Sequence, residues 1–171
     1  MQKRDEEDLH FLGGLDHRRM QELLGYNLAQ AAIPSYAIYE AAIGTPLALR
    51  QVEFTILVLV DSNAEVTQKS LSLALGIAAP NLTVILDRMV ERGFVRRVRS
   101  ETDRRAQLVQ LTTKGTALMR KACAVARDME EELLGHFSAA ERAMLFELLQ
   151  KVAVQRRGPA LRVVANKAKA G

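Results

Sequence analysis

Residues 94–112 read FVRRVRSETDRRAQLVQLT. Apolar and polar residues alternate over 94–100 and again over 106–112, on either side of a short charged segment. Alternation with a period of two is typical of half-buried strands, so this stretch predicts a β-hairpin. Between Arg88 and Arg105, seven arginines stand against three acids, and the resulting net charge of +4 equals that of the whole chain. The hairpin is therefore basic enough to favour an anionic partner.

Two short helices are predicted immediately before the hairpin. Thr67 is a suitable N-cap for a helix over 68–75, which Gly76 ends. Pro80 suits the first turn of a second helix that ends at Gly93. Two short helices with a tight connection form a helix-turn-helix, and a hairpin after them makes a winged helix. The apolar face of the second helix is predicted to consist of Leu82, Ile85, Leu86, Met89 and Val90.

Longer helical patterns flank this region on both sides. Residues 17–42 form one, with a kink or break expected near Ile33 because a proline follows it. Residues 112–134 carry an apolar stripe, and Ser138 begins a capping box for a last helix. Residues 54–60, FTILVLV, fit a strand by their β-branched content and a helix by the segment before them.

Composition narrows the function classes. The chain has 171 residues, 49% of them hydrophobic, and it contains neither a secretory signal nor an apolar run long enough to cross a membrane. We therefore expect a cytoplasmic protein without a membrane partner. The absence of tryptophan and the 5% aromatic content favour duplex over single-stranded nucleic acid. The lone Cys123 lies in a helical pattern and is interpreted as a core residue.

Motifs for catalysis, nucleotide binding and metal binding are missing from the sequence. It contains no glycine-rich phosphate loop, and its three histidines are scattered along the chain. We therefore predict a protein that is not an enzyme and that needs no cofactor or metal. A small cytoplasmic hydrolase with a dispersed active site remains an alternative, because spacing along a chain does not exclude residues that meet in space.

Four segments within 49–115 together resemble the MarR family of winged-helix transcriptional regulators: LRQVEFTILVLV, TQKSLSLALGI, NLTVILDRMVERGFVRR and DRRAQLVQLTTKG. The resemblance implies a mainly α fold with a small β-hairpin wing, and it favours a helix for residues 54–60. It also implies a homodimer on a pseudo-palindromic operator, acting as a repressor that a small aromatic or phenolic anion releases. The alternative is a winged-helix module that binds an acidic protein partner.

The resemblance also implies a domain organisation. We expect a single winged-helix domain over 17–157, between a flexible arm at 1–16 and a basic mobile tail at 158–171. Within this domain, 17–48 and 113–157 are expected to be dimerisation helices and 49–112 the DNA-binding lobe.

Residue chemistry and the resemblance together give twelve candidate DNA-binding residues. Arg105 stands at the family's wing-arginine position and is expected in the minor groove, whereas Asp103 orients a neighbour or caps the turn. Asn81 is equally suited to bonding adenine or its own backbone. The full set is Thr67, Gln68, Lys69, Ala79, Pro80, Asn81, Thr83, Arg97, Arg99, Asp103, Arg104 and Arg105.

An effector site is predicted from two rings and one cation. Tyr36, Tyr39 and Arg50 offer hydroxyls, aromatic faces and a positive charge to a small aromatic anion. Rings on a helix are also typical of a dimer core, and this alternative stays open for both tyrosines.

Overall fold

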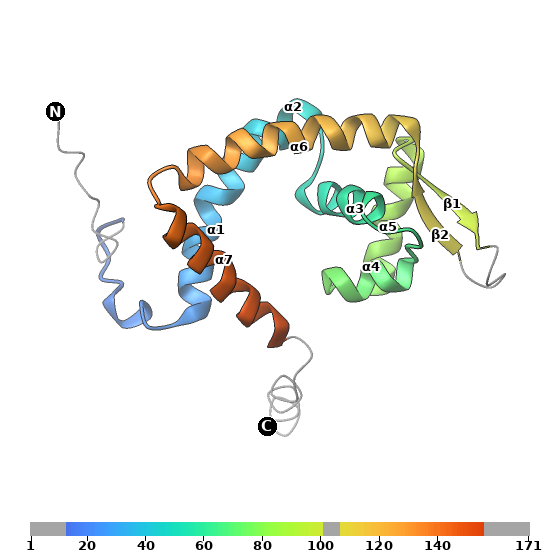
Figure 1. Ribbon diagram of the computed structural model, residues 1–171. Helices are drawn as coiled ribbons and strands as arrows, with labels where there is room; N and C mark the ends of the chain where they lie inside the picture. The colour runs from blue at the N-terminus through green and yellow to red at the C-terminus, as the bar shows by residue number, and fades with distance from the viewer. Residues whose placement is uncertain (1–12, 101–106, 156–171) are drawn as a thin grey trace, which may run out of the picture. The chain divides into compact units, whose positions relative to one another are not determined.

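The computed structural model describes residues 13–100 and 107–155 (Figure 1). Over these ranges the chain is mainly helical with a two-stranded antiparallel sheet, which confirms the predicted fold class. It divides into two compact units, which meet in sequence between Met129 and Glu130. The predicted wing-tip residues Asp103, Arg104 and Arg105, and the predicted basic tail at 158–171, lie outside the described residues.

The first unit opens with helices of different geometry. They are the 3₁₀ turn η2 (Arg18–Met20), α1 (Leu24–Tyr39), the π-helix η3 (Glu40–Gly44) and α2 (Thr45–Leu47). A break near Ile33 is wrong, because α1 continues through Pro34 and the irregular turn lies further on. Pro34 is exposed, so water can satisfy the carbonyl that loses its helical partner there.

The helix pair and hairpin follow in the predicted order. Their elements are α3 (Gln51–Asp61), α4 (Gln68–Leu75), α5 (Ala79–Glu91), β1 (Val95–Arg99) and β2 (Gln107–Leu111). The ambiguous run 54–60 is therefore helical. Thr67 caps α4 by accepting a hydrogen bond from the Ser70 amide at 3.1 Å, and Gly76 ends α4 with φ of +66°. α4 and α5 meet at 115°, within the range of a helix-turn-helix.

The core of the first unit is built mainly from α3, α5 and the hairpin. One predicted core position is wrong: Val90 is 38% exposed, because it lies about 100° around α5 from the fully buried Met89. Cys123 is half-buried and packs against the core, as interpreted from the sequence. The largest fully buried side chains are Ile43, Leu49, Ile56, Leu57, Leu71, Leu82, Leu86, Met89 and Val95.

The turn after α5 is joined to the start of α6 (Thr113–Leu134). Thr112 donates its hydroxyl to the Gly93 carbonyl at 2.6 Å, and the same oxygen accepts the Gly115 amide at 3.0 Å. A Cβ on Gly115 would lie 1.9 Å from the Phe94 carbonyl oxygen. Only glycine fits this approach, which accounts for the glycine that ends the segment DRRAQLVQLTTKG.

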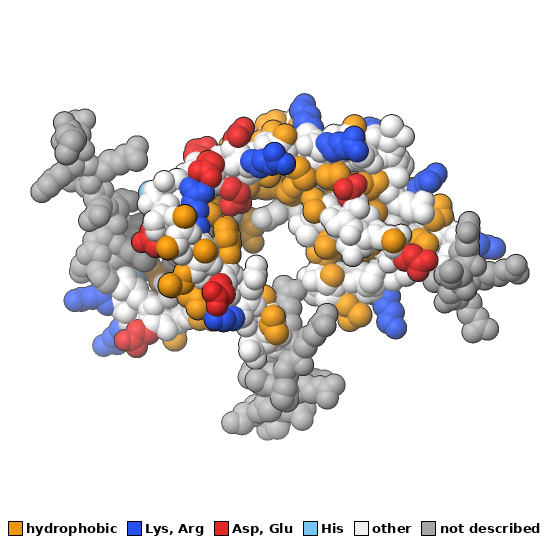
Figure 2. Space-filling view, viewed as in Figure 1, with side chains coloured by type: hydrophobic (Ala, Val, Ile, Leu, Met, Phe, Trp, Pro, Cys, Tyr) orange, Lys and Arg blue, Asp and Glu red, His pale blue; other side chains and the backbone are white. Residues whose placement is uncertain are grey.

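The second unit contains the end of α6 and α7 (Ala139–Val154). The predicted capping box is present, since Ser138 and Glu141 exchange side-chain to backbone hydrogen bonds. Arg142 holds Glu131 at 2.6 Å, which lowers the pKa of this exposed carboxyl. α7 has no buried residue, and hydrophobic side chains are visible along it (Figure 2).

No single helix in the described part of the chain is long and apolar enough to cross a membrane. Two pairs of helices with a bend between them meet the length and composition criteria for a membrane span. One pair is the segment α1–α2 with α3, and the other is α4 with α5. This is weak evidence, since core helices of water-soluble proteins pass the same test.

Candidate nucleic-acid interface

The start of α5 is fastened to α4 by a side-chain network. The Gln68 amide donates to the Thr83 hydroxyl oxygen at 2.6 Å and to the Ala79 carbonyl at 3.4 Å. Thr83 donates in turn to the Ala79 carbonyl at 2.9 Å. Gln68 and Thr83 therefore hold the two helices in one geometry, and their donors are already used inside the lobe.

The first turn of α5 faces outward. Ala79, Pro80 and Asn81 are exposed, whereas Leu82 is completely buried. Lys69, in the first turn of α4, is exposed as well. An exposed helix of this kind can enter a major groove, which is wide enough to admit an α-helix.

The hairpin carries arginines on both of its faces. β1 and β2 pair antiparallel with Arg97 opposite Val109 and Arg99 opposite Gln107, so these two arginines share one face. Arg97 forms an ion pair with Asp87 of α5 at 2.6 Å, which joins the hairpin to the middle of that helix. Basic side chains project around the hairpin and α4 in Figure 2.

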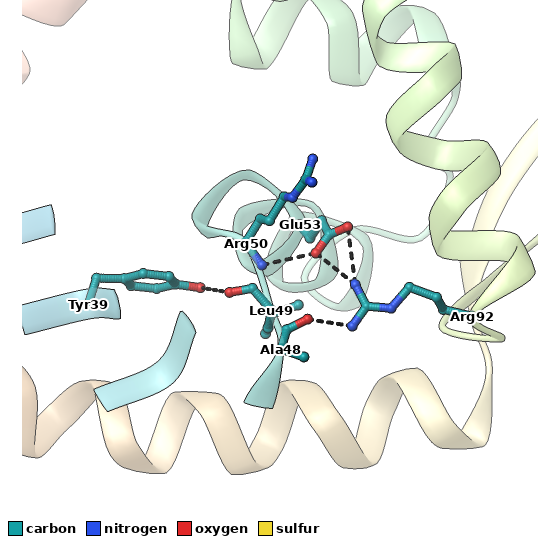
Figure 3. Close-up of polar contacts among 6 residues, drawn as sticks. All are labelled: Tyr39, Ala48, Leu49, Arg50, Glu53 and Arg92. Carbon is teal, nitrogen blue, oxygen red and sulfur yellow. Dashed lines mark hydrogen bonds and ion pairs between the residues drawn. The ribbon is translucent and has the colours of Figure 1, made fainter. Parts of the chain in front are cut away.

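The end of α5 is connected to the start of α3 through a buried carboxylate (Figure 3). The Glu53 side chain is 3% exposed, and its Oε2 accepts the Arg50 amide at 2.9 Å and Arg92 at 3.1 Å. Arg92 also donates to the carbonyl of Ala48, whose φ is +46°, and lies 4.5 Å from the Phe94 ring centroid. One guanidinium therefore ties α5 to the turn between α2 and α3.

The three predicted effector residues have different surroundings. Tyr36 is 59% exposed, but Tyr39 is 5% exposed and donates its hydroxyl to the Leu49 carbonyl at 3.0 Å. Burial, together with the nearby Glu53 and Glu40, raises the pKa of Tyr39 to about 12. In Figure 3 the Arg50 guanidinium extends away from the Tyr39 hydroxyl. The structure does not bring these groups together at a common point.

Nine of the twelve predicted interface residues lie within the described ranges: eight belong to α4, α5 or β1, and Thr67 is the N-cap of α4. Sequence reasoning missed the residues that position them, namely Glu53, Asp87 and Arg92. Asp87 and Arg92 stand in segments that carried the family resemblance, so their presence was noticed without their partners. Glu53 also stands in such a segment, LRQVEFTILVLV, directly before the apolar run 54–60, and nothing in that pattern indicates a buried carboxylate.

A helix pair at 115°, followed by a basic two-stranded hairpin, defines a winged helix-turn-helix protein. The MarR family model matches residues 49–106. The multiple antibiotic resistance protein MarR of Escherichia coli (strain K12) is 35% identical over 109 residues, which are 63% of this chain and 76% of that protein. The chain belongs to the MarR family, a family of transcriptional regulators and not of enzymes.

Two solved protein–DNA complexes contain a protein with this fold. The transcriptional repressor CouR bound to a 23-mer DNA duplex has a TM-score of 0.75 at 31% identity, covering 81% of this chain and 98% of that one. A cysteine-to-serine variant of Escherichia coli MarR complexed with operator DNA has a TM-score of 0.71 at 29% identity, covering 81% and 99%.

Proposed function

We propose that this chain is a sequence-specific duplex-DNA-binding repressor. The observation that carries the proposal is the joined unit of α5 and the hairpin, which presents an exposed helix beside exposed arginines. CouR and Escherichia coli MarR, which share the fold at 31% and 29% identity, were each solved on duplex DNA. α5 then acts as the recognition helix in the major groove, and the hairpin contacts the flanking backbone and minor groove.

Ten of the twelve predicted residues divide by role in this proposal. Lys69 and Arg99 supply exposed charge for phosphates, and Asn81 supplies an exposed amide for a base edge. Arg105, with its neighbours Asp103 and Arg104, is assigned to the wing tip by the family resemblance. Thr67, Gln68, Thr83 and Arg97 act through the geometry they maintain, since each has a partner inside the lobe.

The same proposal includes a homodimer. Leu24 and Ile33 of α1 are more than half exposed in the isolated chain, and so are Met144 and Leu148 of α7. A second copy would cover these apolar side chains, which is the usual reason for a symmetric interface. A two-fold dimer then requires a pseudo-palindromic operator, with half-sites about 10 base pairs apart. Residues 17–48 and 113–157 are the proposed dimerisation segments.

We further propose release by a small aromatic or phenolic anion. The exposed Tyr36 ring supports a contact with such a ligand, while Tyr39 supports the site from within the core. Arg50 contributes an exposed cation at the start of α3. Screening aromatic acids for release of bound operator, with Tyr36→Ala as the comparison, tests this part separately.

Selection of binding sequences from a random duplex pool tests the DNA-binding proposal directly. The purified protein, Arg105→Ala and Arg120→Ala are compared at two salt concentrations, with Arg120 as an exposed arginine of α6 for control. We expect an enriched inverted repeat that Arg105→Ala weakens and Arg120→Ala leaves unchanged. Salt-sensitive retention without sequence preference would contradict the proposal and favour an acidic protein partner.

A further inference from the structure

The hydrogen-bonding capacity at the start of α5 is small. Residues 78–84 contain two polar side chains, those of Asn81 and Thr83. The Thr83 hydroxyl donates to Ala79 and accepts from Gln68, so its polar atom is occupied. Within residues 13–100 and 107–155, the side-chain hydrogen bonds at this end of α5 involve Gln68, Thr83 and the Ala79 carbonyl and do not include the Asn81 amide. The Asn81 side chain is therefore the one group of residues 78–84 that is available to form hydrogen bonds with a base edge.

The remaining exposed surface at this end of α5 is made of methyl and methylene groups. Ala78, Ala79 and Pro80 are exposed, and Val84 is 50% exposed one turn further on. Val84 lies three residues after Asn81, so both stand on neighbouring positions of one helix face. The first arginine of α5 is Arg88, seven residues beyond Asn81.

The chemical groups at the edges of the bases match this surface to A·T base pairs. In the major groove thymine presents a 5-methyl group, and adenine presents an amino donor beside a ring-nitrogen acceptor. Asparagine pairs with adenine through both groups, whereas guanine is read mainly by arginine or lysine. Residues 78–84 contain neither of those cations.

We propose that the start of α5 reads an A·T core in each half-site, with Val84 contacting a thymine methyl and Asn81 bonding an adenine. This inference rests on the proposed function and adds the base class that the helix recognises. Val84 is then a specificity-determining residue, and its neighbours Ala79 and Pro80 keep the backbone close to the groove floor.

Deoxyuridine provides the test, because it keeps the base pairing of thymine and removes only the 5-methyl group. Each thymine of the selected half-site is replaced in turn, and affinity is measured by fluorescence anisotropy at fixed salt. We expect one or two positions at which binding weakens about fourfold per methyl group lost. With Val84→Ala, the loss at one of these positions should shrink to less than twofold.

Two controls distinguish the loss of a methyl contact from a general weakening of binding. Val90→Ala shortens another exposed valine of α5, on its last turn, and should keep the full deoxyuridine penalties. Because uracil also alters duplex stiffness, the change of penalty between Val84→Ala and the unaltered protein isolates the direct contact. A further duplex carries 7-deazaguanine in place of each guanine. A loss of affinity for this duplex would indicate that an arginine contacts guanine.

The outcomes separate this inference from the proposed function. Specific binding that no deoxyuridine weakens, or penalties that persist unchanged in Val84→Ala, would overturn methyl reading while leaving the repressor proposal intact. A larger loss with 7-deazaguanine than with deoxyuridine would also overturn it and assign the reading to Arg88. If no duplex is bound with sequence preference, both the proposed function and this inference are contradicted.

Discussion

Replacing Arg92 with alanine should destabilise the protein more than replacing its partner Glu53 with glutamine. Arg92→Ala leaves a carboxylate that is 3% exposed with only the Arg50 amide to compensate it. Removing one partner of a buried ion pair costs about 3–5 kcal/mol. The Arg92 side chain is 34% exposed and partly screened, so we expect the lower end, about 3 kcal/mol.

Glu53→Gln should lower the free energy of unfolding by about 1 kcal/mol, because the two shorter hydrogen bonds of Glu53 are accepted by one oxygen. Oε2 of Glu53 accepts both the Arg50 amide at 2.9 Å and Arg92 at 3.1 Å. A glutamine that places its carbonyl there keeps both bonds but puts an amide NH2 group in place of Oε1, so the 3.3 Å contact with Arg92 becomes donor against donor and the charge is lost. The double variant should be more stable than Arg92→Ala alone, since it no longer buries an unpaired charge.

Urea denaturation followed by circular dichroism measures these differences. All variants are compared at one protein concentration, because dissociation of the proposed dimer would make stability depend on concentration. Arg120→Ala, the exposed arginine of α6, serves as control and should stay within about 0.5 kcal/mol of the unaltered protein. Equal costs for the two single variants, or a double variant as unstable as their sum, would refute the reasoning.

Three further predictions use other contacts of the same lobe. Gly115→Ala should lower the free energy of unfolding by about 2 kcal/mol or more, since its Cβ would clash with a backbone carbonyl at 1.9 Å, whereas Gly25→Ala, with nothing within 4 Å, should not destabilise in the same urea titration. Because the pKa of Tyr39 is raised from 10.0 to about 12, the stability it contributes is complete below pH 10 and lost towards pH 12; Tyr39→Phe should remove this pH dependence in alkaline denaturation. Asp87→Asn should release Arg97 from its 2.6 Å ion pair and steepen the salt dependence of duplex binding by about one phosphate contact, measured by anisotropy against salt concentration.

Local signals allowed much of the fold to be predicted from the sequence. Thr67, Gly76 and Ser138 act through neighbours a few residues away, so their patterns are legible without the fold. The run 54–60 was ambiguous because a buried helix and a buried strand are both uniformly apolar. The break predicted next to Pro34 was wrong, because a helix tolerates a proline on the side that faces water, and the sequence does not show which side that is.

The candidate site was less predictable than the fold. Position along the helix pair identified Gln68 and Thr83, but their mutual hydrogen bond joins residues fifteen apart and follows no periodic pattern. Glu53 and Arg92 are separated by thirty-nine residues, and their contact exists only once α3 and the end of α5 are packed together. Sequence patterns can therefore indicate which residues face outward. They do not show which of these residues already have a hydrogen-bond or ion-pair partner in the fold.

Three contacts fix α5 at its beginning, middle and end, and each leads to a different element. Thr83 is held by Gln68 of α4, Asp87 by Arg97 of β1, and Arg92, just past the last residue of α5, by Glu53 of α3. A helix held at three points has little freedom to adjust to a poorly matched groove, so its exposed residues are preorganised. Substitutions in the holding pairs should therefore change affinity for every duplex, whereas substitutions of exposed residues such as Val84 should change which duplex is preferred.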